Sequence, residues 1–347
     1  MSFSITVVRS QQLVKFYQNY KIGYKDNTGK IVIQPRYDNG EDFIEGYAIV
    51  TLNSKSGMIN TKGREIVPLK YDLIRWKKFS YGLVSVWLNK KYGYVDTAGK
   101  EIIPCKYDYG DSYFDNGVAV VGQGDKFGCI DTKGNEVIPI KYDVASSFKQ
   151  GIAAFCLNKK CGYLNRINQE VVPFIYDHAS QFFDGMSAAK LDGKWGFIDN
   201  SGKVAIPFKY EETGDFHEGL APVKLNGKWG YVDEGGKIDI PIKYDMVYEF
   251  KDGAAAVNQK GKWGFINRKS GKAFTPIKYD EVSPFQYNEG MVAVKLNGKW
   301  GYLDREGKEV IPFIYKDAFM FMNRKASVTT MDGKNIYIDN KGRETQL

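Results

Sequence analysis

The chain has 347 residues, of which 43% are hydrophobic, and this composition excludes a disordered protein because enough apolar surface is present to bury a large core. The 37 glycines and an aromatic fraction of 15% favour strands and tight turns over helices. The formal net charge of +8 is spread along the chain and therefore gives only a weak indication of an anionic partner.

One sequence pattern recurs about every 34 residues along the chain. Its copies align on Gly23, Gly57, Gly93, Gly128, Gly162, Gly196, Gly230, Gly264 and Gly301, with Ile336 at the same place in a degenerate tenth copy. A fixed interval of this size is typical of repeat architectures. Because no change in composition interrupts the series, we expect one continuous domain over residues 1–347, with the terminal copies, about 1–40 and 316–347, as caps.

Each copy predicts three strands in a fixed order. Apolar alternation over residues 221–225 predicts a strand A, and Asn226-Gly227 predicts a two-residue hairpin turn into a strand B over 228–233. Strand B ends at an Asp-x-x-Gly-Lys turn, as at 304–308, which suits a type I turn closed by a left-handed glycine. Strand C follows, and we expect Pro312 to end it by removing a ladder donor. The remaining segment is either a short fourth strand or a looped return.

Strand B carries apolar groups on both faces. Trp229 and Tyr231 point to one face, and Gly230 and Val232 point to the other. We therefore expect neighbouring copies to cover both faces, with a ring from one copy resting on the strand glycine of another. We interpret the following as repeat-packing residues: Trp195, Trp229, Trp263, Trp300, Gly196, Gly230, Gly264 and Gly301.

The segments GKWGFIDNSGKVAIPFKY, GKWGYVDEGGKIDIPIKYD and GKWGYLDREGKEVIPFIY resemble the WG-repeat (KWG-repeat) family of mostly bacterial proteins, and the resemblance extends from about residue 12 to 342. It implies a non-catalytic β-repeat protein of variable copy number, with no site that transfers to this chain. The chain departs from the pattern in its first five copies, where other residues take the tryptophan place: Ile22, Ser56, Tyr92, Phe127 and Cys161.

We expect an all-β fold of about ten tandem antiparallel hairpin units, stacked as an open β-solenoid or superhelix. A closed β-propeller-like ring is the alternative. The open stack is favoured because the chain starts near strand A and ends after strand C, without the offset that lets the last strands complete a first blade.

A lysine precedes the tryptophan place in all ten copies. In most copies a tyrosine recurs after strand C, and an acidic residue follows it. These acidic residues are Asp38, Asp72, Asp108, Asp143, Asp177, Glu211, Asp245 and Asp280. The lysines either pair with these carboxylates, at about 0 to 1 kcal/mol each, or form a track for a polyanion. The candidate ligand-binding lysines are Lys194, Lys228, Lys262 and Lys299. The tryptophan column is an alternative platform on which sugar rings could stack.

Two copies contain insertions, and insertions in repeat proteins often lie on the binding face. They are LIRWKKFSYG after Asp72 and FQYNEG at 285–290. The candidate ligand-binding residues within them are Trp76, Lys77, Lys78 and Tyr287.

Enzymatic chemistry finds no support in the sequence. No Gly-rich phosphate loop, nucleophile elbow or metal-ligand spacing occurs, so we expect no catalytic residues, no metal and no cofactor. Of the two histidines, His217 is interpreted as a solvated loop residue. The hairpin register places Cys156 opposite Cys161 in a non-hydrogen-bonded pair, close enough for a disulfide, although we expect free thiols in a reducing cytoplasm.

We expect a non-catalytic scaffold for protein–protein interaction. Its expected partner is another protein, and the chain itself is expected to be a monomer. The alternative is a carbohydrate- or polyanion-binding module that uses the tryptophan, tyrosine or lysine columns. No apolar run suits a signal peptide or a transmembrane segment, so a cytoplasmic location without membrane insertion is expected.

Overall fold

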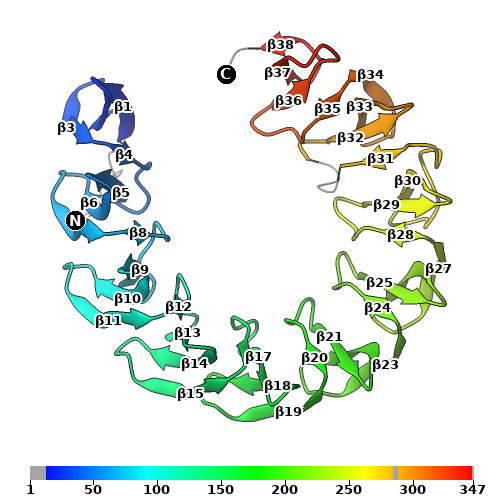
Figure 1. The fold of residues 1–347 in the computed structure, drawn as a ribbon, viewed down its shortest axis with the longest axis horizontal. Helices are drawn as coiled ribbons and strands as arrows, with labels where there is room; N and C mark the ends of the chain where they lie inside the picture. Colours follow the sequence, from blue (N-terminus) through cyan, green and yellow to red (C-terminus); the bar gives the residue numbers. More distant parts are fainter. Residues whose placement is uncertain (1–12, 284–287, 346–347) are drawn as a thin grey trace, which may run out of the picture. The chain divides into compact units, whose positions relative to one another are not determined.

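The computed structural model describes residues 13–283 and 288–345, and all regular structure in these ranges is β. The strands form ten small antiparallel sheets, numbered here in chain order, which follow one another along the chain (Figure 1). The prediction of an all-β tandem-repeat fold is confirmed. The chain divides into two compact units, Met1–Phe174 and Ile175–Leu347, which are described separately. The expectation of one continuous capped domain stays a prediction.

Sheets 1 to 5 begin in the first unit. Sheet 1 contains β1 (Val14–Gln18), β2 (Lys21–Lys25) and β3 (Ile31–Tyr37). Sheet 2 contains β4 (Asn39–Gly40), β5 (Tyr47–Leu52), β6 (Lys55–Asn60) and β7 (Glu65–Tyr71). Sheet 3 contains β8 (Leu73–Ile74), β9 (Leu83–Leu88), β10 (Lys91–Asp96) and β11 (Glu101–Tyr107). Sheet 4 contains β12 (Tyr109–Gly110), β13 (Val118–Gln123), β14 (Lys126–Asp131) and β15 (Glu136–Tyr142). Sheet 5 contains β16 (Val144–Ala145), β17 (Ile152–Leu157), β18 (Lys160–Asn165) and β19 (Glu170–Tyr176).

Sheets 6 to 10 lie in the second unit. Sheet 6 contains β20 (His178–Ala179), β21 (Met186–Leu191), β22 (Lys194–Asp199) and β23 (Val204–Tyr210). Sheet 7 contains β24 (Glu212–Thr213), β25 (Leu220–Leu225), β26 (Lys228–Asp233) and β27 (Ile238–Tyr244). Sheet 8 contains β28 (Met246–Val247), β29 (Ala254–Gln259) and β30 (Lys262–Asn267). Sheet 9 contains β31 (Glu281–Val282), β32 (Met291–Leu296), β33 (Lys299–Asp304) and β34 (Glu309–Tyr315). Sheet 10 contains β35 (Asp317–Ala318), β36 (Lys325–Thr329), β37 (Asn335–Asp339) and β38 (Glu344–Thr345).

The two predicted turns are confirmed. Leu225 pairs with Lys228 across Asn226-Gly227, whose φ angles of 52° and 73° suit the tight turn that matches strand twist. At the end of strand B, Asp304 Oδ1 accepts the backbone N–H groups of Glu306 (3.1 Å) and Lys308 (2.8 Å). Turn chemistry readable from the sequence thus fixes the register of strands A and B.

Strand C does not end at its proline, so that expectation is wrong. β34 continues through Pro312 to Tyr315. Tyr302 pairs with Ile311 and Trp300 with Tyr315, so the strand C residues between these pairs outnumber those of strand B and form a bulge. A proline is tolerated there because the bulge removes the need for its missing donor.

The same bulge explains the strand glycine. A Cβ on Gly301 would lie 2.7 Å from the Ile311 carbonyl oxygen and 3.0 Å from the Phe313 nitrogen. The glycine is therefore required by strand C of its own copy, and the expectation that a ring of another copy rests on it is wrong. Similarly close backbone atoms face Gly196, Gly230 and Gly264.

Of the two readings of the last segment, the short fourth strand is correct. This two-residue strand joins the sheet of the following copy, as β28 does when it pairs with β29. A complete sheet therefore runs in the order short strand, strand A, strand B, strand C.

Neighbouring sheets bury each other's faces, as expected for repeat packing. Tyr231 of sheet 7 packs in one cluster with Ala255 and Val257 of sheet 8. Val232, on the opposite face, packs in another cluster with Phe197 and Ile206 of sheet 6. Within each unit, each sheet is thus one layer, and the core lies between successive layers.

The cysteine register is confirmed, but the expectation of free thiols is wrong. Cys156 pairs with Cys161 across the β17–β18 hairpin, and a disulfide joins them. The cause is the close approach of side chains in a non-hydrogen-bonded antiparallel pair. Within residues 13–283 and 288–345 there is no helix with the length and apolar character needed to cross a bilayer.

Candidate functional site

The lysine column is mostly paired with the acidic column. Lys55 Nζ donates to Asp72 Oδ1 at 2.5 Å. Equivalent pairs are Lys21–Asp38, Lys91–Asp108, Lys126–Asp143, Lys228–Asp245 and Lys262–Asp280. The alternative in which these lysines pair with carboxylates is therefore observed for two of the four candidate lysines, Lys228 and Lys262.

The second carboxylate oxygen links each pair to the next copy. Asp72 Oδ2 accepts the backbone N–H of Asn89, in the hairpin turn of sheet 3, at 2.8 Å. The hydrogen bonds from Lys55 and from Asn89 hold the pKa of Asp72 below its usual value. The aspartate thereby joins strand B of one sheet to the turn of the following sheet.

Lys194 and Lys299 differ from the other lysines of the column. In the described part of the chain neither forms an ion pair. Glu211 stands at the acidic place after Lys194 and accepts the Gly227 N–H at 3.0 Å, and Lys316 takes the acidic place after Lys299. These two candidate cations lie far apart in the chain, so they form no continuous track.

The insertion after Asp72 is tied to the preceding copy. Lys77 pairs with Glu41 at 2.9 Å and Lys78 with Glu45 at 2.6 Å. The Trp76 ring is 42% exposed and lies 5.9 Å from the ring of Tyr113. The fourth candidate in the insertions, Tyr287, lies outside the described residues.

The four tryptophans are half-buried, and each is the second residue of its strand B, next to the hairpin turn. A lysine of strand A lies near three of the rings, with its Nζ atom 5.8 to 5.9 Å from the ring centroid: Lys190 at Trp195, Lys224 at Trp229 and Lys295 at Trp300. Lys224 and Lys295 are held by Glu212 (2.5 Å) and Glu281 (2.7 Å) of the short strand. The tryptophan rings therefore pack between sheets, as expected, and three of them also lie beside a lysine side chain.

Two of these tryptophans also contact a ring from the short strand region. Tyr248 stacks on Trp263 at 5.3 Å with an interplanar angle of 14°, and His178 lies 5.1 Å from Trp195. Trp229 and Trp300 have no such ring contact among the described residues.

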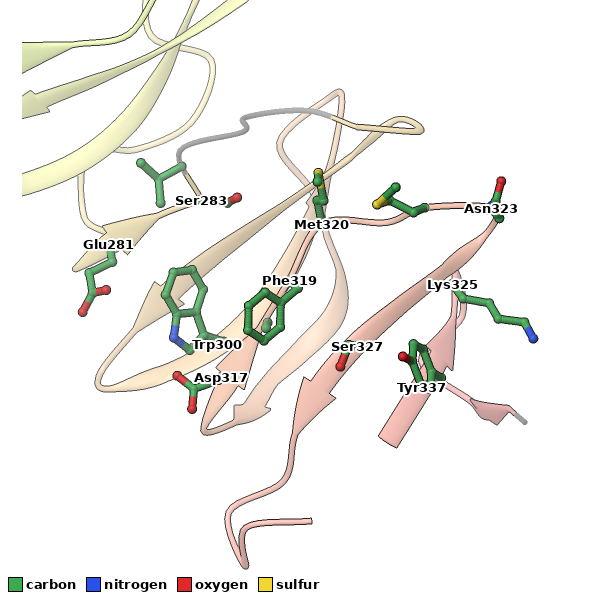
Figure 2. A pocket seen from close by; sticks show the side chains of 13 residues that line it. Glu281, Ser283, Trp300, Asp317, Phe319, Met320, Asn323, Lys325, Ser327 and Tyr337 are labelled. Atoms are coloured by element: carbon green, nitrogen blue, oxygen red, sulfur yellow. The ribbon is translucent and has the colours of Figure 1, made fainter. Parts of the chain in front are cut away.

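Each of the same two tryptophans lines a hollow in the second unit. The Trp300 groove, between sheets 9 and 10, has a volume of about 1000 Å³ (Figure 2). It is lined by Ser283, Trp300, Phe319, Met320, Met322 and Tyr337, among others. The Trp229 groove, between sheets 7 and 8, has a volume of about 390 Å³. It is lined by Gly214, Pro222, Trp229, Val247, Tyr248 and Glu249, among others.

The Trp300 groove combines aromatic and flexible apolar groups. Phe319 is 61% exposed and Met322 is 57% exposed. Figure 2 shows the side chain of Trp300, from β33, and that of Phe319, which directly follows β35, with Met320 above them in the view. Sequence analysis identified Trp300 but missed Phe319 and both methionines, because these residues belong to the most degenerate copy and meet Trp300 only when two sheets pack.

Titratable groups gather near the Trp229 groove. The His217 side chain is half-exposed, as expected for a loop residue. It also has an acidic partner, because its Nε2 lies 3.0 Å from Glu249 Oε2. Burial, and then the charge of Glu249, raise the pKa of Asp215, whereas burial lowers the pKa of His178. In the described ranges no three His, Cys, Asp or Glu side chains are grouped so as to hold a metal ion.

Several solved structures are similar to the chain at low identity. They include a eukaryotic initiation factor (10% identity, TM-score 0.48, 87% of this chain and 96% of that chain) and BamB from Moraxella catarrhalis (9%, 0.38, 66% and 79%). Another is Hsv2p from Kluyveromyces lactis (10%, 0.36, 67% and 95%). No curated protein sequence matches the chain.

The family model of the WG containing repeat matches nearly the whole chain. Its nine copies cover residues 22–55, 57–92, 92–127, 127–161, 162–195, 195–229, 229–263, 263–300 and 300–334. This protein therefore belongs to the family of WG containing repeat proteins.

Proposed function

We propose that this protein is a non-catalytic repeat scaffold that binds another protein through the Trp300 groove. The supporting observation is the exposure of Phe319 and Met322 beside the half-buried ring of Trp300, in a hollow of about 1000 Å³. Exposed apolar groups gathered in a concave site and edged by polar residues are typical of interaction surfaces. We propose that the chain acts as a monomer in this role and works in the cytoplasm.

A protein partner fits the groove better than a polyanion does. Lys295, whose Nζ lies 5.9 Å from the Trp300 ring, is paired with Glu281 at 2.7 Å, so this pair offers little net charge. Elsewhere, most lysines of the column are neutralised by aspartates, as Lys228 is by Asp245. A polyanion needs several unpaired cations in a row, because its affinity arises from released counterions.

A protein partner also fits better than a carbohydrate. Sugar recognition combines an aromatic platform with polar groups directed at hydroxyls. The exposed polar residues Asp317 and Asn323 line the Trp300 groove, but Phe319 and Met322 add exposed apolar surface that sugar hydroxyls would not match. Methionine side chains adapt to varied apolar surfaces and are over-used at protein-binding sites. Catalysis is not part of the proposal, since Glu281 is engaged by a lysine and the turn aspartates recur in most copies.

The test is affinity capture from an extract of the source cells with three forms of the full chain: wild type, Phe319→Glu and Ile314→Glu. Ile314 is 49% exposed on β34 and does not line the groove, so it is the matched control. We expect one protein to be retained by wild type and Ile314→Glu but lost by Phe319→Glu, with unchanged circular dichroism. Equal retention by all three forms, or retention of glycan or nucleic acid alone, would contradict the proposal.

A further inference from the structure

In three of the four sheets that carry a tryptophan, the residue that borders the indole occupies one equivalent backbone position. The residue after each short strand donates its N–H to a strand A carbonyl: Gly214 to Pro222 (3.0 Å), Tyr248 to Ala256 (2.9 Å) and Ser283 to Ala293 (2.9 Å). These positions lie on the face that carries the tryptophan, because side chains alternate along a strand. In sheets 7 to 9 the size of this side chain therefore affects what stands beside the indole. In sheet 6 the equivalent residue is Ser180, whose N–H donates to Ala188 (2.9 Å), and the ring beside Trp195 comes instead from His178 of the short strand.

Among sheets 7 to 9, the place beside the indole is filled in one sheet and open in two. In sheet 8 the residue is tyrosine, and the ring of Tyr248 stacks on Trp263. In sheets 7 and 9 it is glycine and serine, and there Trp229 and Trp300 line hollows. The two hollows are thus equivalent to the place that an aromatic ring fills in the sheet between them.

The glycine in sheet 7 is held by its surroundings. A Cβ on Gly214 would lie 2.7 Å from Cγ of Pro222, the residue that replaces alanine on strand A, and 3.3 Å from Glu249. Since any larger residue at this position would collide with the proline ring, the chain cannot fill the Trp229 groove from its own short strand without rearrangement.

We infer that the Trp229 and Trp300 grooves each receive an aromatic side chain of the partner protein, stacked on the indole as Tyr248 is stacked on Trp263. This inference rests on the proposed function and names the chemistry of the partner. Stacked rings with centroids 4.5 to 7 Å apart are a favoured arrangement of aromatic pairs. In the Trp300 groove, Met320 adds a thioether, which makes favourable contacts with aromatic rings.

The two grooves are separated by one filled sheet. Face-to-face sheets lie about 10 Å apart, so two repeats place the grooves roughly 20 Å apart, the length of about six extended residues. A partner segment with two aromatic residues at this spacing would bind both grooves, and the second contact would strengthen the first through effective concentration.

The probe is N-acetyl-L-tyrosinamide, titrated into the full chain while the tryptophan indole N–H signals are followed by nuclear magnetic resonance. N-acetyl-L-leucinamide and methyl glucoside serve as apolar and sugar controls. We expect the tyrosine amide to shift the Trp229 and Trp300 signals and to leave Trp195 and Trp263, which already have ring partners, unchanged. The leucine amide and the glucoside are expected to shift them far less.

Two variants exchange the filled and open states. Ser283→Tyr copies sheet 8 and should abolish the response of Trp300 while that of Trp229 remains. Tyr248→Ser copies sheet 9 and should add a response at Trp263. The wild-type titration decides the question even if a variant folds poorly.

A response to the glucoside alone, or no response of Trp229 and Trp300 to the tyrosine amide, would overturn this inference. If a partner is lost on Phe319→Glu while the tyrosine amide shifts no signal, the proposed function stands and the aromatic occupant is wrong. If the amide shifts both signals while capture is unaffected by Phe319→Glu, the aromatic subsites stand and the proposed function of the Trp300 groove fails.

Discussion

Lys55 and Asp72 form an ion pair at 2.5 Å whose carboxylate also accepts the N–H of Asn89 in the next hairpin. The contact thus joins two successive sheets through one side chain. Because the same arrangement recurs in other copies, as at Lys228, Asp245 and Lys260, the lysine column serves the stacking of repeats. This accounts for a regular row of lysines without any anionic ligand.

Substitution of Asp72 tests this structural role. Asp72→Ala removes both the ion pair and the acceptor for the Asn89 turn, and we expect a lower midpoint of thermal unfolding. Asp72→Asn keeps an oxygen that can accept the Asn89 N–H, so its midpoint of thermal unfolding should fall less. Asp125→Ala, an exposed aspartate in another hairpin turn, is the control. A midpoint unchanged in Asp72→Ala relative to Asp125→Ala would show that the contact contributes nothing to stability.

The acidic column predicts loss of stability in acid. Hydrogen bonds from the paired lysines lower the folded-state pKa below the usual 3.8 at Asp72, Asp108, Asp143, Asp245 and Asp280. A lowered pKa in the folded state adds stability above the unfolded-state value, and this stability is lost as the pH falls through the folded-state pKa.

Denaturant unfolding between about pH 7 and pH 3 measures this effect. We expect the free energy of unfolding to fall below about pH 4, and to fall less steeply in Asp72→Asn. The buried Asp111 has a raised pKa and opposes the trend, since its folded form favours the protonated state. Identical pH profiles of wild type and Asp72→Asn would rule out a contribution from this pair.

The bulge in strand C predicts a high cost for a methyl group on the strand glycine. At Gly230 a Cβ would lie 2.6 Å from the Ile240 carbonyl oxygen and 2.7 Å from the Ile242 nitrogen. Because backbone must move to admit it, we expect Gly230→Ala to cost about 1 to 3 kcal/mol in denaturant unfolding. Gly235→Ala, where the nearest atom is 3.4 Å away, is the control in the same sheet and should be nearly neutral. Equal effects of the two changes would be incompatible with the bulge geometry.

The disulfide predicts a specific labelling pattern. Protein purified without reductant and unfolded in denaturant should react with a maleimide at Cys105 and Cys129 only. Reduction should expose Cys156 and Cys161 as well and lower stability by about 2 kcal/mol, as expected for a short closed loop. Four reactive thiols before reduction would mean that the hairpin is not cross-linked. Rapid thiol trapping in the source cells would also test the cytoplasmic location, because disulfides are rare in reducing compartments.

Most of the fold was predictable from short turn sequences, because these determine which strands pair and in which register. Asn226-Gly227 sets the pairing of strands A and B, and the same register logic placed Cys156 opposite Cys161. The course of strand C past Pro312 was not predictable in this way. It depends on the close approach of strand C to Gly301 on the neighbouring strand, which no dipeptide signal describes.

The grooves were less accessible to sequence analysis than the sheets. The tryptophan column was visible, but its four members look alike until the residue after the short strand is known to stand beside them. Gly214, Tyr248 and Ser283 occupy a position that varies between copies, and the sequence gives no reason to prefer it over other variable positions. The effect of this variation is visible only when successive sheets pack: Trp229 and Trp300 then line grooves, whereas Tyr248 covers Trp263.

The most direct test of the proposed binding surface is photo-cross-linking from inside the Trp300 groove. A photoreactive benzoylphenylalanine is placed at Phe319 in one form of the full chain and at Ile314 in the other. We expect a covalent adduct with a partner protein from position 319, attached beside an aromatic residue of that partner, and none from position 314. No adduct from position 319 while wild type still captures a partner, or equal adducts from both positions, would contradict the account.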